Sequence, residues 1–224
     1  SHNIRNSANG APITVPPQDM VLGLYYMTKL RKSTKELVVK GEGSTFYSAE
    51  EVNIARNEKQ LDIHASIKVR LDVMDENGDV ESKLIETTAG RVIFNELVPM
   101  EVGYQDAVLT KKALRDIISK VLAVCGTAKT AKFLDDIKNL GYDMAFKGGL
   151  SFNLADVIIP PEKEEMVAKA ELEVDEVMAN YNMGLITNNE RYNQIIDIWT
   201  HTNTRLTATL MDRIQTDQQG FNSI

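Results

Sequence analysis

The side chains of this chain that could do chemistry are mostly carboxylates, and one group of them has metal-like spacing. These side chains occupy positions 1, 3, 5 and 12 of a calcium-loop pattern: Asp75, Asn77, Asp79 and Glu86. That pattern requires glycine at position 6, where this chain has Val80, and it requires flanking helices. The neighbouring residues alternate as strands do, so Asn77-Gly78 predicts a hairpin turn and not a calcium site.

The sequence also lacks a convincing motif for phosphate binding, zinc binding or nucleophilic catalysis. Residues 126–132 begin like a phosphate-binding loop, but Ala131 replaces its second glycine and Phe133 its serine or threonine. The three histidines are scattered and Cys125 is the single cysteine, so no zinc site is indicated. No G-x-S-x-G motif, Cys–His pair or paired-carboxylate arrangement stands out. The sequence therefore predicts no catalytic residue and no metal site in this chain.

The clearest pattern is structural: two long amphipathic segments are joined by a short turn within residues 183–203. Apolar residues recur at the coiled-coil period in both segments. The first seam comprises Val167, Ala170, Val174, Val177 and Tyr181, and the second Tyr192, Ile196, Trp199, Leu206 and Leu210. Gly184 suits a helix end, and Thr187 with Glu190 forms a T-x-x-E capping box for the next helix. The pattern predicts an antiparallel helical hairpin.

The residues before this hairpin predict a mixed α/β module, so the expected fold class is α+β. The expected elements are a helix at 49–58, strands at 63–74 and 83–98, and helices at 110–125 and 127–139, the last stopping near Gly141. Residues 30–45 predict a loop. Residues 20–27, MVLGLYYM, predict an apolar segment that needs a sheet partner from outside the chain. Pro160-Pro161 is the expected boundary before the hairpin.

Composition narrows the classes of function. The 224 residues have a net charge of −7, so the chain alone should not bind nucleic acid strongly. No apolar run is long enough for a membrane span, and the single cysteine fits a reducing compartment. These features predict a cytoplasmic protein without membrane contact. Acidic residues crowd 162–176 and basic residues 29–35, and each cluster is either a solvated face or a docking surface.

The sequences of four segments resemble those of a known protein family. The segments are NSANGAPITVPPQDMVLGLYYMT (6–28), KGEGSTFYS (40–48), TTAGRVIFNELVP (87–99) and GLITNNERYNQIIDIWT (184–200). The chain resembles the bacterial DNA-directed RNA polymerase β′ subunits, and its closing FNSI also looks like that family. LSFNLADVIIPPEK resembles the Bacteroidetes type. The resemblance covers nearly the whole chain, in order.

The resemblance implies an excised, non-catalytic fragment of a nucleotidyltransferase. Residues 1–28 would be the trailing edge of the catalytic barrel, 29–159 the pore domain and 160–224 the funnel domain with its rim hairpin. The family signature N-A-D-F-D-G-D, which binds the active-site magnesium, does not occur in these residues. The resemblance thus implies no cofactor in this fragment, magnesium bound elsewhere in the parent enzyme, and no activity for the fragment alone.

The resemblance also implies site residues and partners. Gln18 and Asp19 match a Q-D pair on the substrate-entry side of the secondary channel, although Pro17 stands where the family usually has serine. The rim would dock Gre-type transcription factors through the matching residues Glu190, Arg191, Tyr192, Asn193 and Asp197. Other polymerase subunits are expected partners, and DNA and RNA would be bound only by the whole enzyme.

Alternatives remain for these residues and for the function. Arg191 and Asp197 could pair across the helix surface, and Tyr192 and Trp199 could be seam residues that hold the hairpin together. One rival function is an autonomous coiled-coil interaction module unrelated to a polymerase. Another is an independent hydrolase or nucleotidyltransferase, which the lack of a catalytic constellation disfavours.

Overall fold

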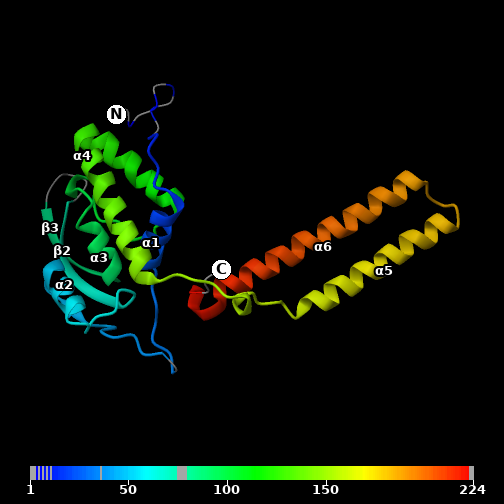
Figure 1. Cartoon of the computed structure of the whole chain (residues 1–224), viewed down its shortest axis with the longest axis horizontal. Coiled ribbons are helices and arrows are strands. Elements are labelled where there is room, and N and C mark those ends of the chain that lie inside the picture. The colour runs from blue at the N-terminus through cyan, green and yellow to red at the C-terminus, as the bar shows by residue number, and fades with distance from the viewer. Residues whose placement is uncertain are drawn as a thin grey trace. The chain divides into compact units, whose positions relative to one another are not determined.

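The computed structural model describes residues 4, 6, 8, 10, 12–35, 37–74 and 80–221. The chain divides into two compact units, Ser1–Leu150 and Ser151–Ile224, whose elements are labelled in Figure 1. The predicted boundary at Pro160-Pro161 lies near the start of the second unit.

The sheet of the first unit has three strands in the order β1-β2-β3. Strands β2 (Ser66–Met74) and β3 (Val80–Thr88) pair antiparallel over their whole length, from Ser66 opposite Thr88 to Met74 opposite Val80. The predicted pair of strands is therefore confirmed, while its turn at Asn77-Gly78 lies outside the described residues. The short strand β1 (Thr45–Phe46) pairs parallel with β2.

Helix α2 (Ala49–Asn57) confirms the predicted short helix, and the Ser48 side chain accepts a hydrogen bond from the Glu51 backbone N–H. The strand predicted over 83–98 is wrong in its second half. The chain leaves β3 at Thr88, whose side chain caps helix α3 (Ala89–Asn95) by accepting from the Arg91 N–H. The β-branched run in this segment suggested a strand, but the cap and burial on two sides favour a helix.

Helix α3 joins the two apolar cores of this unit. Val92 packs with the inner face of the sheet, whereas Ile93 and Phe94 pack with the helices on the other side. The helical core is formed mainly by α1 (Gln18–Thr28) and α4 (Lys111–Gly148). The expectation that residues 20–27 seek a sheet partner is wrong, because they form α1 and bury Leu24 and Met27 in this core.

Glycines allow α1 and α4 to approach closely. A Cβ at Gly23 would lie 2.1 Å from the Gly141 carbonyl oxygen, which is far too short for a contact between two non-bonded atoms. The predicted helix stop near Gly141 is therefore wrong, since this glycine is needed for packing and α4 continues to Gly148. Gly149 ends the helix in the left-handed conformation.

The two helices predicted at 110–125 and 127–139 correspond to the two halves of α4. Gly126 lies between them with φ 75° and ψ 177°, a non-helical conformation that kinks α4. The glycine of the phosphate-loop-like stretch thus has a structural use. The short 3-10 helix η1 (Met100–Val102) lies near this kink, where Glu101 accepts a hydrogen bond from Lys129 at 2.5 Å.

The second unit is the predicted antiparallel hairpin, formed by α5 (Glu162–Asn182) and α6 (Asn188–Thr216) (Figure 1). The Thr187–Glu190 capping box is present at the start of α6, and Gly184 has a positive φ of 75°. The short 3-10 helices η2 (Leu154–Asp156) and η3 (Asp217–Gly220) precede and follow the hairpin. A small sheet with long helices confirms the α+β class.

The predicted seam is confirmed on α5 and in the second half of α6, and it is wrong in the first turns of α6. Ala170 and Val177 of α5 are buried. On α6 the partly buried positions are Arg191, Ile195, Ile198, Thr202, Leu206, Thr209, Leu210, Arg213 and Ile214. The predicted Leu206 and Leu210 belong to this seam, but Tyr192, Ile196 and Trp199 are exposed. Ile195 and Ile198 have the same spacing as Ile196 and Trp199. In the first turns of α6 the pair that begins one residue earlier, Ile195 and Ile198, faces the seam.

Candidate functional site

Three exposed apolar residues of α6 form a stripe at the turn end of the hairpin. Tyr192, Ile196 and Trp199 are 61%, 43% and 39% exposed, and spacings of four and three residues place them on one side of the helix. Met183 and Leu185, in the turn itself, are also exposed. We call Tyr192, Ile196 and Trp199 the α6 stripe. Their exposure contradicts the alternative in which Tyr192 and Trp199 hold the two helices together.

Two of the five predicted docking residues are used by the hairpin itself. The Glu190 carboxylate accepts hydrogen bonds from the backbone N–H and the hydroxyl of Thr187, at 2.7 and 2.9 Å, and these bonds lower the pKa of Glu190. The Arg191 guanidinium lies 4.9 Å from the centre of the Tyr181 ring on α5. The Glu190 contacts cap the start of α6, and the Arg191 contact holds it against the end of α5.

The other three predicted docking residues, Tyr192, Asn193 and Asp197, are exposed. No ion pair joins Arg191 to Asp197 among the described residues, so the alternative of a surface pair between them has no support. Asp197 instead lies beside His201 and Arg205 in a groove of about 410 Å³ between α5 and α6. The turn end of α6 thus offers apolar, amide and carboxylate groups on adjoining faces.

Gln18 and Asp19 are the first two residues of α1, and both are exposed. Pro17 occupies the N-cap position and supplies no side-chain cap. Asp19 lies in the first helical turn, where a carboxylate is stabilised by the helix dipole. These two residues belong to the first unit and the rim residues to the second, so the two predicted sites are separate features of the chain.

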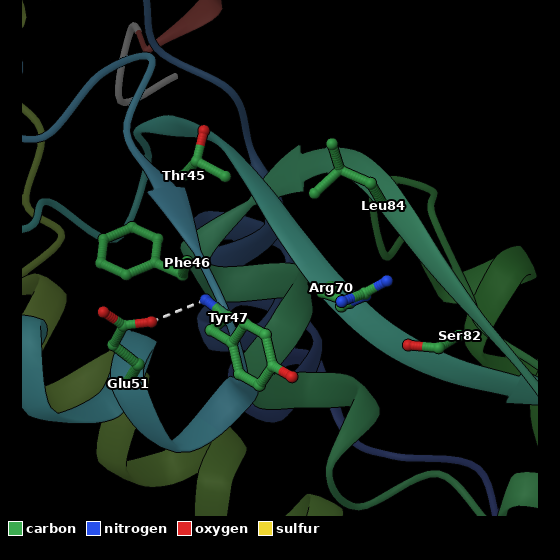
Figure 2. A pocket seen from close by; sticks show the side chains of 7 residues that line it. All are labelled: Thr45, Phe46, Tyr47, Glu51, Arg70, Ser82 and Leu84. Carbon is green, nitrogen blue, oxygen red and sulfur yellow. Dashed lines mark hydrogen bonds between the residues drawn. The ribbon is translucent and has the colours of Figure 1, made fainter.

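A pocket of about 460 Å³ lies on the outer face of the sheet (Figure 2). The Arg70 guanidinium lies 5.7 Å from the centre of the Tyr47 ring, and the pocket's one carboxylate, Glu51, accepts a hydrogen bond from the Tyr47 backbone N–H at 2.6 Å. Ser82 and Leu84 complete one wall. These residues contain no base next to a nucleophile, so the pocket offers binding surface but no recognisable catalytic arrangement.

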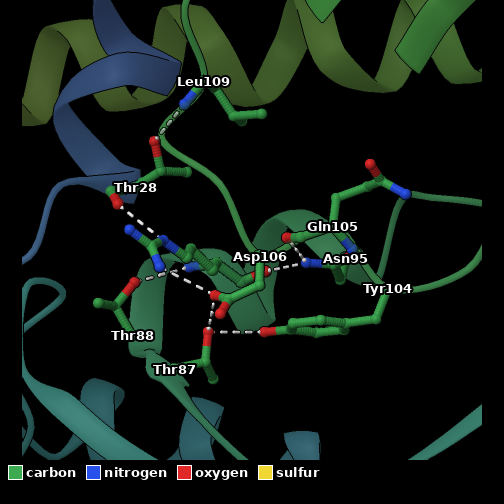
Figure 3. Close-up of polar contacts among 9 residues, drawn as sticks. Thr28, Thr87, Thr88, Asn95, Tyr104, Gln105, Asp106 and Leu109 are labelled. Carbon is green, nitrogen blue, oxygen red and sulfur yellow. Dashed lines mark hydrogen bonds and ion pairs between the residues drawn. The ribbon is translucent and has the colours of Figure 1, made fainter. Parts of the chain in front are cut away.

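A polar junction in the first unit was not predicted from the sequence (Figure 3). Arg91 donates to the Thr28 carbonyl at 3.0 Å and to the Asp106 carboxylate at 2.9 Å. The Thr87 hydroxyl donates to the same carboxylate oxygen at 2.8 Å and accepts from the Tyr104 hydroxyl at 2.9 Å. Burial raises the pKa of Tyr104 to about 12.

This junction connects the ends of α1 and β3 with α3 and the loop that precedes α4. Asn95 strengthens it by exchanging hydrogen bonds with the Gln105 backbone. Thr87, Arg91 and Asn95 all lie in TTAGRVIFNELVP, one of the segments that carry the family resemblance. The local sequence around this junction indicates a helix cap, through the spacing from Thr88 to Arg91. It does not predict the long-range contacts.

In the described part of the chain, no group of three or more His, Cys, Asp or Glu side chains is arranged to hold a metal ion. Within the same residues, no helix combines the length and apolar character that a membrane span requires.

Comparisons with known proteins converge on one family. The family model described as RNA polymerase Rpb1, domain 3, matches residues 3–157. The chain is 64% identical to the DNA-directed RNA polymerase subunit beta' of Parabacteroides distasonis, 62% to that of Bacteroides fragilis strain YCH46 and 58% to that of Flavobacterium psychrophilum. Each alignment covers 100% of this chain, but only 15%, 15% and 16% of the respective relatives.

Proposed function

Because the chain belongs to the β′ family of DNA-directed RNA polymerase subunits, we propose that it lines the secondary channel and that its hairpin docks transcription factors. Nucleotide addition would belong to the whole polymerase, since the magnesium-binding N-A-D-F-D-G-D signature does not occur in these residues. Family membership removes the alternative of an interaction module unrelated to a polymerase.

The α6 stripe is the observation that carries the docking proposal. The exposure of Tyr192, Ile196 and Trp199 in one row is unfavourable in water, and covering these side chains with a partner lowers the free energy. Asn193 and Asp197 lie beside this row and can add specific hydrogen bonds. An apolar centre with polar neighbours is the usual composition of a protein–protein interface.

The hairpin suits this task because contacts of its own hold the start of α6 near the turn. Glu190 completes the capping box and Arg191 stacks on Tyr181. The turn end can therefore keep its shape without a partner, and a docked Gre-type factor would meet a pre-formed surface.

The docking proposal is tested by Trp199→Ala in the β′ subunit of the assembled polymerase. We expect the affinity for a Gre-type factor to fall about 30-fold, corresponding to about 2 kcal/mol for a buried tryptophan anchor. Factor-independent nucleotide addition should not change. Met211→Ala is the matched control, because Met211 is 50% exposed on the same helix but far along it from the turn. Unchanged factor affinity in Trp199→Ala would contradict the proposal.

Gln18 and Asp19 carry a narrower proposal, that they border the path of incoming nucleotides. Both side chains are exposed at the start of α1, where the helix N-terminus favours anions. In the assembled polymerase, Gln18→Ala should raise the KM for nucleotides with little change in kcat. An unchanged KM would contradict the proposal that Gln18 borders this path.

A further inference from the structure

The last residue of α1, Thr28, is held by hydrogen bonds from two other segments of the first unit. The side chain of Thr28 is fully buried, and its hydroxyl accepts from the Leu109 backbone N–H at 3.0 Å (Figure 3). The Thr28 carbonyl accepts from Arg91 Nε at 3.0 Å. The end of α1 is therefore tied both to α3 and to the segment that precedes α4.

Arg91 connects α1 with the rest of the polar junction. Its guanidinium donates in two directions, from Nε to the Thr28 carbonyl and from Nη1 to the Asp106 carboxylate at 2.9 Å. The donors of an arginine lie in a fixed planar fork, so the two bonds together hold the side chain in one orientation. The Arg91 side chain is only 16% exposed. A lysine at this position would keep the charge but could not reproduce both bonds.

The backbone of α3 also lies directly against the end of α1. A Cβ at Gly90 would lie 1.8 Å from the Met27 carbonyl oxygen, so a side chain at this position would collide with α1. The Gly90 N–H in turn donates to the Ile63 carbonyl at 2.9 Å. Because Arg91 follows Gly90 in the chain, the guanidinium that holds Thr28 extends from a backbone that is itself fixed.

The opposite end of α1 has fewer directional contacts among the described residues. Pro17 occupies the N-cap position and supplies no side-chain cap. The middle of α1 lies against α4 through Gly23 and Gly141. Glycines let two helices approach, but they form no side-chain ridges that fix the position of one helix along the other. A helix moves as one body, so a displacement of the last turn of α1 is carried to its first, about 16 Å away.

We propose that Arg91 is a positioning residue for nucleotide entry: by holding Thr28, it sets the position of Gln18 at the other end of α1. The inference rests on the proposal that Gln18 borders the path of incoming nucleotides. Arg91 acts through the helix, because it contacts the last residue of α1 and Gln18 is the first.

The test is Arg91→Lys in the β′ subunit of the assembled polymerase, with KM and kcat for nucleotides measured separately. We expect KM to rise about fivefold while kcat changes by less than about twofold, because nucleotide binding is disturbed and the chemical step is not. A loss of folded enzyme would lower the overall rate without raising KM. An unchanged KM would overturn the proposal.

Tyr104→Phe is the matched control. It removes the hydrogen bond from the Tyr104 hydroxyl to Thr87, which belongs to the same junction, and leaves both bonds of Arg91 in place. The KM of this variant should equal that of the unsubstituted enzyme. An increase equal to that of Arg91→Lys would overturn the proposal, since any weakening of the junction would then have the same effect.

A second variant serves if Arg91→Lys does not assemble. Asp106→Asn keeps an oxygen that can accept from Arg91 but removes the negative charge, so it should raise KM in the same direction and by less. An unchanged KM in an assembled Asp106→Asn enzyme would likewise overturn the proposal.

The double variant Gln18→Ala/Arg91→Lys shows whether Arg91 acts through Gln18. If it does, the KM of the double variant should be close to that of Gln18→Ala alone. Increases that multiply would overturn the proposal. The two proposals can fail separately: if Gln18→Ala raises KM and Arg91→Lys does not, only the positioning role falls, whereas an unchanged KM in Gln18→Ala contradicts the nucleotide path itself.

Discussion

The two units of this chain use their apolar residues in different ways. The first unit buries many of them in two cores that share α3 and encloses side chains such as Phe94, Phe133 and Leu114 almost completely, although others such as Phe146 and Tyr47 stay exposed. The second unit is a single pair of helices, in which α6 has no fully buried residue. Its largest aromatic side chain, Trp199, lies at the surface.

The difference separates residues that fold the chain from residues available to partners. In the first unit, the apolar faces that form the two cores each pack against another helix or against the sheet. The hairpin has only the seam between α5 and α6, so an outward-facing apolar residue there adds nothing to that seam. Substitutions of core residues in the first unit should therefore cost stability, whereas substitutions in the α6 stripe should cost affinity for a partner.

The largest expected effect is on the core of the first unit. Phe133→Ala should lower the free energy of unfolding by about 4 kcal/mol, because it removes a buried ring and leaves a cavity. Ile198→Ala in the half-buried hairpin seam should cost about 1 kcal/mol. Denaturant unfolding of the chain, followed by hydrogen exchange in each unit, measures both. Equal losses would contradict the distinction between the units.

A substitution without loss of apolar surface tests the packing of α1 on α4. Gly23→Ala should destabilise the first unit by about 2–3 kcal/mol, since its Cβ would collide with the Gly141 carbonyl and force the helices apart. Gly103→Ala is the control: Gly103 has φ 80° and ψ 168°, a conformation that glycine alone adopts readily, but no atom lies near its Cβ position, so its loss of about 1–3 kcal/mol comes from backbone strain and leaves the packing of α1 on α4 intact. A tolerated Gly23→Ala would disprove the close approach.

Much of this fold could be predicted from local signals. The capping residues Ser48 and Thr187 fixed the starts of two helices, and alternating residues indicated β2 and its antiparallel partner. The sequence could not choose the seam of α6, because Ile195 and Ile198 have the same spacing as Ile196 and Trp199. Which stripe is buried depends on tertiary contacts such as Arg191 against Tyr181.

The other errors have the same physical origin. Val92 and Ile93 suggested a strand until their burial on opposite sides of α3 was known. Gly141 suggested a helix end because its role lies in contact with α1, which is distant in sequence. For the candidate site, motif matching named residues at the turn end of α6, but only the structure separated those that brace the hairpin from those that are exposed.

A smaller effect is expected at the turn of the hairpin. Thr187→Ala should reduce stability by about 1 kcal/mol, because it removes the oxygen that accepts the Glu190 N–H at the start of α6. Hydrogen exchange should accelerate in the first turn of α6 and remain unchanged in the first unit. Thr204→Ala, on an exposed position within the same helix, serves as the control. Equal exchange in both variants would argue against the capping box.

The pH dependence of stability offers the finest comparison between the units. His64 in the first unit is buried, and its ring meets Tyr26 edge-on at 4.5 Å. Burial lowers the pKa of His64; the hydrogen bond to the Lys29 carbonyl and the charge of Asp62 oppose this, while Arg31 and Lys29 add to it. The folded state therefore binds fewer protons than the unfolded state between the lowered pKa of His64 and a pH of about 6.5.

It follows that the contribution of His64 to stability is complete above pH of about 6.5 and is lost as the pH falls through its lowered pKa. Unfolding of the first unit should become easier across this window. In His64→Gln the corresponding part of the pH slope should disappear. A slope that is identical in the variant would show that another group is responsible.

The central claim, that the α6 stripe faces away from α5 and is available to a partner, is tested most directly by the fluorescence of Trp199. This is the single tryptophan of the chain, so its emission reports on one position. In the free chain, acrylamide should quench Trp199 readily, and quenching should weaken when a Gre-type factor is added. A tryptophan already protected from acrylamide in the free chain, or equally quenched with and without the factor, would contradict the account.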